Sequence, residues 1–299
     1  MEIKREIDFI KKSKITIVIS LSFIILGIIS FFVKGGFNLG IDFAGGTNLR
    51  VKIDSSVQAD SEKIRGVLGE GFTITRLGTA EEQEFFISFQ KEQNSEEIVK
   101  NLKKNFGEEK MTVLSEDTVG PKIGKEFQRM GFWAAVLSLL LLLLYIAFRF
   151  EFKFGIAAIV ALFHDVLITL GFVSLLGFTF DIPVLAAVLT LLGYSINDTI
   201  IIFDRIREES SNLHLDKREY VMVINQAINK TLSRTLLTSF TTISAIIVLI
   251  FFGGVDLRAM ALVLLIGFIT GTYSSVFVAS PLLILWEKLL GKKKELKKV

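Results

Sequence analysis

The 299-residue chain contains no cysteine and only two histidines. Without cysteine it can form neither disulfide bonds nor thiolate sites for metals. A serine, histidine and aspartate triad could draw only on His164 and His214, and the acidic residues show no spacing typical of a metal site. We therefore expect no cofactor, no metal and no hydrolytic centre.

Charged residues are also missing from long stretches of the chain. Hydrophobic residues make up 51% of it, and the mean hydropathy of +0.55 is higher than is usual for soluble proteins. Six runs carry at most two ionisable groups, and each is near or above the roughly 20 residues that cross a bilayer: 15–33, 130–148, 154–176, 182–203, 235–255 and 259–286. The sequence therefore predicts an α-helical polytopic membrane protein with six transmembrane helices.

Lysine and arginine accumulate on one side of these predicted spans. The N-terminal arm, the links after the second and fourth spans and the C-terminal tail are basic, whereas the remaining short links contain only Arg258. Because basic loops stay in the cytoplasm, we predict that both termini are cytoplasmic. The net charge of +3 then reflects topology, which gives no case for nucleic-acid binding. The basic tail is expected to contact anionic lipid or a cytoplasmic partner.

The first span is interpreted as a retained anchor, because it is longer than a signal-peptide core and no small-residue cleavage site follows it. The predicted organisation has five parts: a cytoplasmic arm (1–14), the first span (15–33), an external domain with its linkers (34–129), spans two to six (130–286) with a cytoplasmic loop (204–234), and a basic tail (287–299).

The external segment has the pattern of a small α+β domain. Its predicted elements are strands at 47–53, 72–77, 84–90 and 110–119 and helices at 56–70 and 95–106, with Ser95 as the N-cap of the second helix. The order β-α-β-β-α-β predicts a ferredoxin-like fold.

Glycines flank this domain in "GIDFAGGT" (40–47) and "VGPKIG" (119–124). Gly120 and Gly124 are too close together for a phosphate-binding loop, and Glu126 occupies the position of the required serine or threonine. We interpret Gly45, Gly46 and Gly120 as tight turns where the domain meets its membrane helices. Because the sequence shows no ATPase motif, we do not expect this chain to be an enzyme.

Two carboxylates fall inside the predicted spans. Asp165 is near the middle of the third span, and Asp198 is about five residues from the cytoplasmic end of the fourth, roughly 7–8 Å deep. A charge near the centre of a bilayer costs about 2.5–3.5 kcal/mol on insertion scales, so such residues are functional candidates. Asp198 is interfacial instead if its span is shifted by one turn. The same alternative fails for Asp165, because the shifted span would contain too few apolar residues.

Other polar residues accompany these carboxylates. Arg234 opens the fifth helix and Thr238 follows one turn later, while Tyr194 shares the helix face of Asp198. Burial disfavours an ionised carboxylate and a nearby arginine favours it, so a site with both influences can exchange a proton as helices move. Arg234 alternatively snorkels to the interface. His164 is predicted to point to a different helix face from Asp165, as a packing histidine or an accessory proton group.

Small residues recur every four positions in the last span, at Gly267, Gly271, Ser275 and Ala279. This spacing predicts a face for close helix packing. A polar path through Thr272, Tyr273 and Ser274 is the alternative interpretation.

Motifs along nearly the whole chain resemble SecF proteins of the SecD/SecF family, in family order: "GIDFAGGT" (40–47), "VGPKIG" (119–124), "ALFHDV" (161–166), "GYSINDTIIIFDRIRE" (193–208), "NKTLSRTLLTSFTT" (229–242) and "GTYSSVF" (271–277). Together they are highly specific. One span, an external domain and five further spans also resemble half of a transporter of the RND superfamily.

The resemblance implies a subunit in the bacterial cell (inner) membrane that works with SecD and uses the proton-motive force. It would promote late steps in the export of polypeptides through the SecYEG channel, with YajC as a further partner. The resemblance places the family's proton-carrying aspartate at Asp198, its partner arginine at Arg234 and its other membrane aspartate at Asp165. The coupling ion is then H⁺, and ATP hydrolysis belongs to a different component.

Two other functions remain open from the sequence. An RND-type exporter of small molecules or lipids usually needs two such halves, and a substrate-sized apolar pocket in the external domain would favour it. A scaffold that only stabilises the channel complex would tolerate uncharged residues at Asp165, Asp198 and Arg234.

Overall fold

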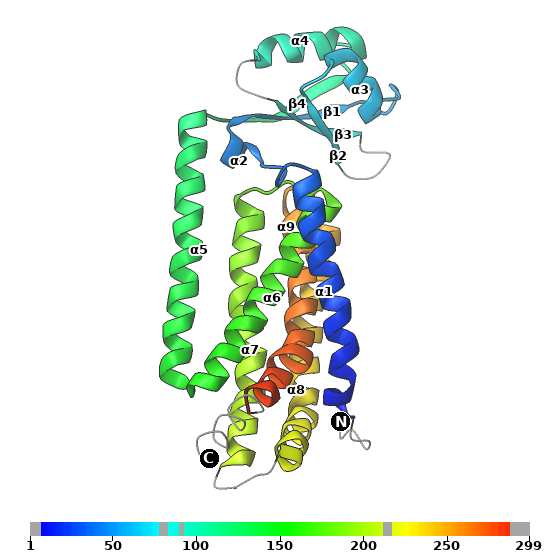
Figure 1. The fold of residues 1–299 in the computed structure, drawn as a ribbon. Helices are drawn as coiled ribbons and strands as arrows, with labels where there is room; N and C mark the ends of the chain where they lie inside the picture. The colour runs from blue at the N-terminus through cyan, green and yellow to red at the C-terminus, as the bar shows by residue number, and fades with distance from the viewer. Residues whose placement is uncertain (1–6, 78–82, 90–92, 212–216, 288–299) are drawn as a thin grey trace.

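The computed structural model describes residues 7–77, 83–89, 93–211 and 217–287. Its long helices form a bundle, and a small sheet covered by two helices lies at one end of it (Figure 1). We call this end the domain end. The opposite end carries the first and the last residues that the structure describes (Figure 1), and we call it the termini end.

Within the described residues, six helices are long and apolar enough to cross a membrane. Five of them are α1 (Phe9–Val33), α5 (Pro121–Arg149), α6 (Phe152–Leu176), α7 (Ile182–Ser210) and α8 (Lys217–Phe252). The sixth comprises α9 (Val255–Ser274), a π-helical turn η1 (Ser275–Ala279) and a helical continuation to residue 287. The predicted fold class is confirmed.

The helices extend beyond the uncharged runs that predicted them. α1 begins six residues before 15, and α5 begins nine residues before 130. The segment 204–234 is helical up to Ser210 and again from Lys217. Charge scarcity marks only the part of a helix that suits hydrocarbon, whereas capping and packing extend helices into polar surroundings.

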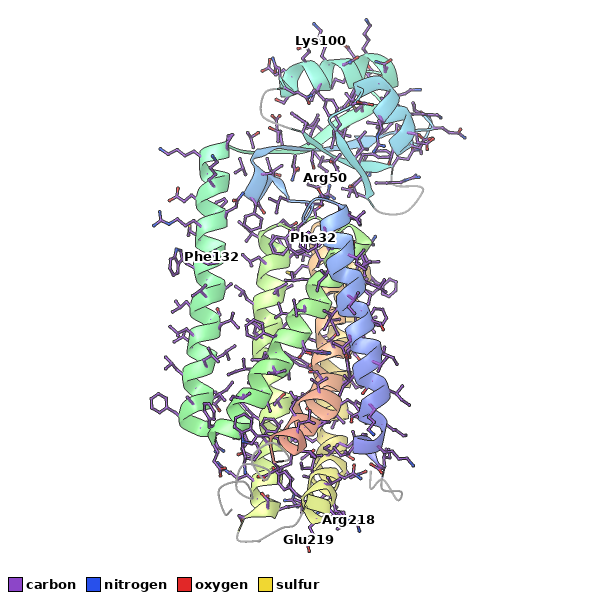
Figure 2. All side chains as sticks on the ribbon, in the orientation of Figure 1. Phe32, Arg50, Lys100, Phe132, Arg218 and Glu219 are labelled. Carbon is purple, nitrogen blue, oxygen red and sulfur yellow. The ribbon has the colours of Figure 1, made fainter. Side chains whose placement is uncertain are left out.

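The helices differ in how much of their surface the protein itself covers. The spans of α6, α7 and α9 are about half buried, whereas only a small share of α1, α5 and α8 is buried. Figure 2 marks Phe32 on α1 and Phe132 on α5, whose side chains are 74% and 63% exposed. Such apolar exposure fits contact with lipid or with another membrane protein.

α1 and α6 cross at a pair of glycines. A Cβ on Gly27 would lie 2.5 Å from the Cα of Gly171, so the two backbones are in direct contact. One turn further toward the domain end, the Ser30 and Ser174 hydroxyls hydrogen-bond at 3.0 Å. α1 is thus fixed to the bundle by small residues.

The external domain contains β1 (Gly46–Ile53), α3 (Ser61–Leu68), β2 (Thr73–Leu77), β3 (Glu84–Phe89), α4 (Ser95–Phe106) and β4 (Met111–Val119). The sheet order is β2-β3-β1-β4 and all neighbours are antiparallel, which confirms the predicted ferredoxin-like fold. Alternate residues of the strands pack under α3 and α4, with Leu49, Phe85 and Ile87 fully buried. Asn94, and not Ser95, caps α4, because its side chain accepts a hydrogen bond from the Glu96 N–H.

The two glycine-bearing stretches beside the domain pack against each other. Gly45 and Gly46 have φ values of +78° and +139°, which favour glycine, and a Cβ on Gly45 would lie 3.0 Å from the Cα of Pro121. A Cβ on Gly124 would lie 2.9 Å from the Phe43 carbonyl oxygen in the short helix α2 (Ile41–Ala44). The glycines therefore permit close backbone contact where the domain joins α5.

A strut of hydrogen bonds joins the domain to the loop between α6 and α7. Gly40 donates its N–H to the Phe180 carbonyl at 2.9 Å, and Phe180 donates to the Asn38 carbonyl at 2.7 Å. The Asp42 carboxylate also accepts the N–H of Ile182, the first residue of α7, at 3.0 Å. These bonds connect the start of α7 directly to the segment that leads into the external domain.

Candidate functional site

Asp165 is completely buried in the middle of α6, and two hydroxyl donors and an imidazole nitrogen surround its carboxylate. The Ser195 hydroxyl on α7 donates to Oδ2 at 2.5 Å, and the Ser274 hydroxyl on α9 donates to the same oxygen at 2.8 Å. His164 Nδ1 lies 2.8 Å from Oδ1. The carboxylate therefore holds α6, α7 and α9 together, which explains how the protein accommodates it away from water.

The predicted orientation of His164 is wrong. Although adjacent Cβ atoms on a helix point to different faces, the imidazole is oriented so that its Nδ1 reaches the next residue's carboxylate. Its other nitrogen, Nε2, lies 3.0 Å from the Tyr273 hydroxyl. Tyr273 in turn hydrogen-bonds to the buried Ser20 of α1. The polar cluster thus spans four helices.

Asp198 lies on the same buried face of α7 as Ser195, three residues further toward the termini end. Only 1% of its surface is exposed, and neither carboxylate oxygen has a hydrogen-bond partner among the described residues. The Thr272 hydroxyl on α9 is close enough to influence the carboxylate but bonds to Ser239 and to the Phe268 carbonyl instead, and the Arg234 charge on α8 acts on Asp198 electrostatically. An ionised carboxylate here would lack the hydrogen bonds that normally offset burial, so this arrangement suits the protonated group.

None of the other predicted residues forms a hydrogen bond with Asp198 in the described chain. Arg234 is exposed, and the Thr238 hydroxyl donates back to the Arg234 carbonyl at 2.9 Å. Tyr194 stacks on Phe268 of α9 with ring centroids 3.9 Å apart, and within the described chain its buried hydroxyl has no partner. The structure therefore joins Asp165 and His164 in one cluster, whereas the functional roles of all six predicted residues stay predictions.

Close packing of α7 against α9 positions the Asp165 donors. A Cβ on Gly271 would lie 2.9 Å from the Ser195 Cβ, and one on Gly267 would lie 3.0 Å from the Leu191 side chain. The predicted small-residue face thus does pack closely. The π-helical turn η1 begins directly after Ser274, and such turns often occur at functional sites.

Ser195, Ser274 and Ser20 were not identified from the sequence as members of this cluster. A hydroxyl in an apolar helix is common, because it can donate to the carbonyl one turn earlier in its own helix. The pairing of two serines with one carboxylate depends on contacts between distant helices, which local spacing does not reveal. The alternative interpretation, a polar path through Thr272, Tyr273 and Ser274, did include two residues of the cluster, Tyr273 and Ser274.

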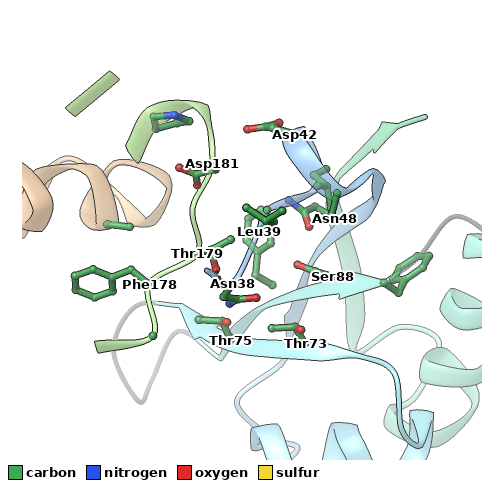
Figure 3. Close-up of a pocket in the computed structure, with 18 of the residues that line it drawn as sticks. Asn38, Leu39, Asp42, Asn48, Thr73, Thr75, Ser88, Phe178, Thr179 and Asp181 are labelled. Atoms are coloured by element: carbon green, nitrogen blue, oxygen red, sulfur yellow. Dashed lines mark hydrogen bonds between the residues drawn. The ribbon is translucent and has the colours of Figure 1, made fainter. Parts of the chain in front are cut away.

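A cleft lies between the open face of the sheet and the domain end of the bundle (Figure 3). Its volume is about 550 Å³, and its lining mixes hydroxyl, amide, carboxylate and apolar groups, including Asn38, Leu39, Thr73, Ser88, Phe178 and Asp181. Burial raises the pKa of Asp181 above its ordinary value, and the neighbouring Asp42 adds to this effect. Asp181 also caps α7 by accepting the Val184 N–H.

Comparison with known protein families shows which family this chain resembles. The family described as protein export membrane protein SecD/SecF, C-terminal, matches residues 98–289, and the SecD/SecF GG motif matches residues 29–57. A protein translocase subunit SecF from Desulfurispirillum indicum is 42% identical over 294 residues, which cover 94% of this chain and 91% of that protein. A protein translocase subunit SecDF from Thermus thermophilus is 42% identical over 84% of this chain and 35% of its own length.

Solved structures agree with these sequence matches. The crystal structure of SecDF from Thermus thermophilus, titled a translocon-associated membrane protein, matches with a TM-score of 0.84 and 40% identity over 96% of this chain and 40% of that chain. SecDF in its super-membrane-facing form matches with a TM-score of 0.73 and 38% identity over 100% of this chain and 41% of that chain. The chain therefore belongs to the SecD/SecF family of protein-export membrane proteins.

Proposed function

We propose that this chain is the SecF-type subunit of a protein-export complex, and that it uses the proton-motive force to promote late steps of polypeptide export through SecYEG. Its relatives named protein translocase subunit support the export function. One observation supports the coupling to protons: Asp198 is buried in a membrane helix without a hydrogen-bond partner in the described chain, within electrostatic range of Arg234.

The partners that we propose are SecD, SecYEG, YajC, the exported polypeptide and the surrounding lipid. The Thermus relative named SecDF is much longer than its matching part, which supports a SecD-like partner for this chain. The mostly exposed faces of α5 and α8 provide membrane surface for such a partner.

The proposed complex lies in a bacterial cell membrane with the termini end of this chain in the cytoplasm. Basic residues at that end support this orientation through the positive-inside preference; they include Lys11, Lys12, Arg149, Arg205 and Lys230. We assign nucleotide hydrolysis to another component. Gly120 caps α5 and Gly124 packs on the Phe43 carbonyl, which are structural uses of these glycines.

In the proposed mechanism, a proton from the external side neutralises Asp198 and weakens its attraction to Arg234. Release of the proton restores the attraction, so α7 and α8 alternate between two arrangements. The motion reaches the external domain because α7 begins at the strut that holds Gly40 and Asp42. The domain would then pull or hold the emerging polypeptide.

The first test is secretion of a reporter protein in cells depleted of their own copy. Wild type, Asp198→Asn and the control Asp204→Asn are compared at equal membrane abundance, with and without a proton gradient. Asp204 lies on the same helix but is partly exposed and pairs with Arg149 at 2.8 Å, so its loss should cost at most about 1 kcal/mol. We expect wild type and Asp204→Asn to restore gradient-dependent export and Asp198→Asn to fail.

Other outcomes would select another function. If Asp198→Asn restores export as well as wild type, the chain acts as a scaffold and the proton role of the carboxylate is wrong. If even wild type fails to restore export, the small-molecule exporter becomes the better explanation. The structure offers little for that exporter, since the cleft near the domain has a mixed lining and lies between domain and bundle.

A further inference from the structure

A row of hydrogen bonds connects Asp165 to α1, the helix that leads into the external domain. Asp165 Oδ1 lies 2.8 Å from His164 Nδ1, and His164 Nε2 lies 3.0 Å from the Tyr273 hydroxyl. The Tyr273 hydroxyl contacts the Ser20 hydroxyl. We propose that Ser20, Tyr273 and His164 form a proton relay through which the buried α6 carboxyl exchanges its proton with the termini end. This inference rests on the proposed function, because it assumes that the chain exchanges protons.

The hydrogen bonds along this row define one protonation state of the relay. When the Asp165 carboxylate is ionised, it accepts from His164 Nδ1–H, and the neutral imidazole accepts the Tyr273 proton at Nε2. The tyrosine oxygen then accepts from the Ser20 hydroxyl. Every donor in the row points toward the carboxylate, which also accepts from two serines on neighbouring helices.

Addition of one proton at the Ser20 end converts this state into a second one. The original Ser20 proton passes to the tyrosine oxygen, the tyrosine proton passes to Nε2, and the Nδ1 proton passes to Asp165. The imidazole remains neutral, Asp165 becomes protonated, and the row gains one proton in total. Ser20 now donates its new proton to the Thr16 carbonyl, a contact of 2.9 Å that the structure already contains. Both states are fully hydrogen-bonded, and the conversion needs no side-chain movement.

The hydroxyl-bearing face of α1 leads from Ser20 toward the termini end. Thr16 and Ser13 follow at intervals of one turn, and Ser13 is buried against the bundle. Asp8, the N-cap of α1 at the termini end, precedes Ser13 by five residues. The relay therefore begins on a face that approaches the aqueous boundary proposed for the cytoplasmic side.

Few other charged groups can affect the proton on Asp165. His164 and Tyr273 face it from α6 and α9, and Asp198 is one turn beyond the Ser195 donor on α7. Arg234 contributes from α8 through its effect on Asp198. α1 adds no charge there, because residues 15–33 are uncharged.

Infrared difference spectroscopy of the full-length chain in lipid vesicles tests the relay directly. As the pH falls, the tyrosine C–O band should shift together with the appearance of a protonated carboxyl band, because Tyr273 changes from donor toward His164 to donor toward Ser20. Asp165→Asn should remove the tyrosine change together with the part of the carboxyl band that belongs to Asp165, while the part that belongs to Asp198 remains, and Tyr273→Phe should remove the tyrosine change. The control Tyr145→Phe, on the exposed face of α5, should remove neither. A tyrosine band that does not follow the carboxyl band overturns the proposal.

The gradient-dependent export assay provides a second measurement. Tyr273→Phe and Ser20→Ala should each lower proton-driven export by about fivefold or more, the factor that corresponds to about 1 kcal/mol for one hydrogen bond. Ser20→Thr retains the hydroxyl and should restore export. Ser22→Ala is the matched control, since Ser22 is on the exposed face of α1 and makes the same bond to the carbonyl four residues earlier.

The two measurements separate this inference from the proposed function. If wild-type export does not depend on the gradient, the proposed function fails, while the infrared bands still decide whether the relay exists. If export depends on the gradient but Ser20→Ala and Ser22→Ala behave alike, the relay is wrong and the proposed function stands.

Discussion

Replacement of Gly271 with alanine should damage the Asp165 cluster without changing any polar residue. The new methyl carbon would lie 2.9 Å from the Cβ of Ser195 and 3.3 Å from its hydroxyl oxygen. Carbon atoms in contact are normally about 3.5–4.0 Å apart, so α7 and α9 must separate by about 0.6–1.1 Å. Ser195 and Ser274 sit on these two helices and share one carboxylate oxygen.

A separation of this size exceeds the lengthening that the hydrogen bonds to Asp165 can tolerate. The Ser274 bond to Asp165 measures 2.8 Å, and hydroxyl bonds weaken beyond about 3.0 Å. Overpacking of a core costs about 1–3 kcal/mol, and a hydrogen bond to a charged group contributes about 1.5–3 kcal/mol. We therefore expect Gly271→Ala to lose at least about 2 kcal/mol of stability.

The assay is thermal unfolding of the purified full-length chain in detergent, combined with the export assay. A loss of about 2 kcal/mol should lower the unfolding midpoint by about 3 °C or more. Gly193→Ala is the control, because a Cβ at Gly193 meets nothing within 4 Å and alanine favours helix by about 1 kcal/mol. If the two variants unfold at the same temperature and export equally well, the contact of α7 with α9 does not position the site.

Two further predictions concern the ends of the molecule. Asn229→Ala should release Ile7 just before α1, because the Asn229 amide bonds both the N–H and the carbonyl of Ile7 at 3.0 and 2.9 Å; faster proteolysis beside Ile7 would show it, and unchanged cleavage would contradict it. At the other end, hydrogen bonds from Ser56 hold the pKa of Asp54 below its ordinary value. The carboxylate therefore supports the native turn above its unfolded pKa, and this support disappears as the pH falls through the lower folded pKa. Ser56→Ala should raise the pKa of Asp54, which an NMR titration measures; an unaltered titration would contradict the assigned cause.

The membrane spans and the external fold were predictable because their signals are local. Twenty uncharged residues can satisfy their backbone in lipid only as a helix, and alternating residues with two amphipathic helices define the small sheet. Helix ends were less predictable. α8 begins at Lys217 because a polar helix can continue outside the membrane, where its Asn225 accepts the N–H of Phe9 at 2.9 Å.

The partners within the site were not predictable from one sequence. The burial of Asp165 followed from hydropathy, but its donors Ser195 and Ser274 come from helices that are 30 and 109 residues away. The crossing of Gly27 with Gly171 joins two helices whose glycines show no shared spacing. Such contacts depend on how the helices are arranged around each other, which periodicity along one helix does not determine.

The two buried carboxylates differ in a way that suggests a division of roles. Asp165 is surrounded by donors from three helices, so either protonation state can be satisfied where it stands. Asp198 has no hydrogen-bond partner in the described chain, so its ionised form needs a different arrangement of α7 and α8, one that brings Arg234 closer. In the mechanism that we propose, a proton on Asp165 is exchanged without moving helices, whereas a proton lost from Asp198 forces them to move. Since Ser195 and Asp198 are one turn apart on α7, any such movement also changes the donors around Asp165.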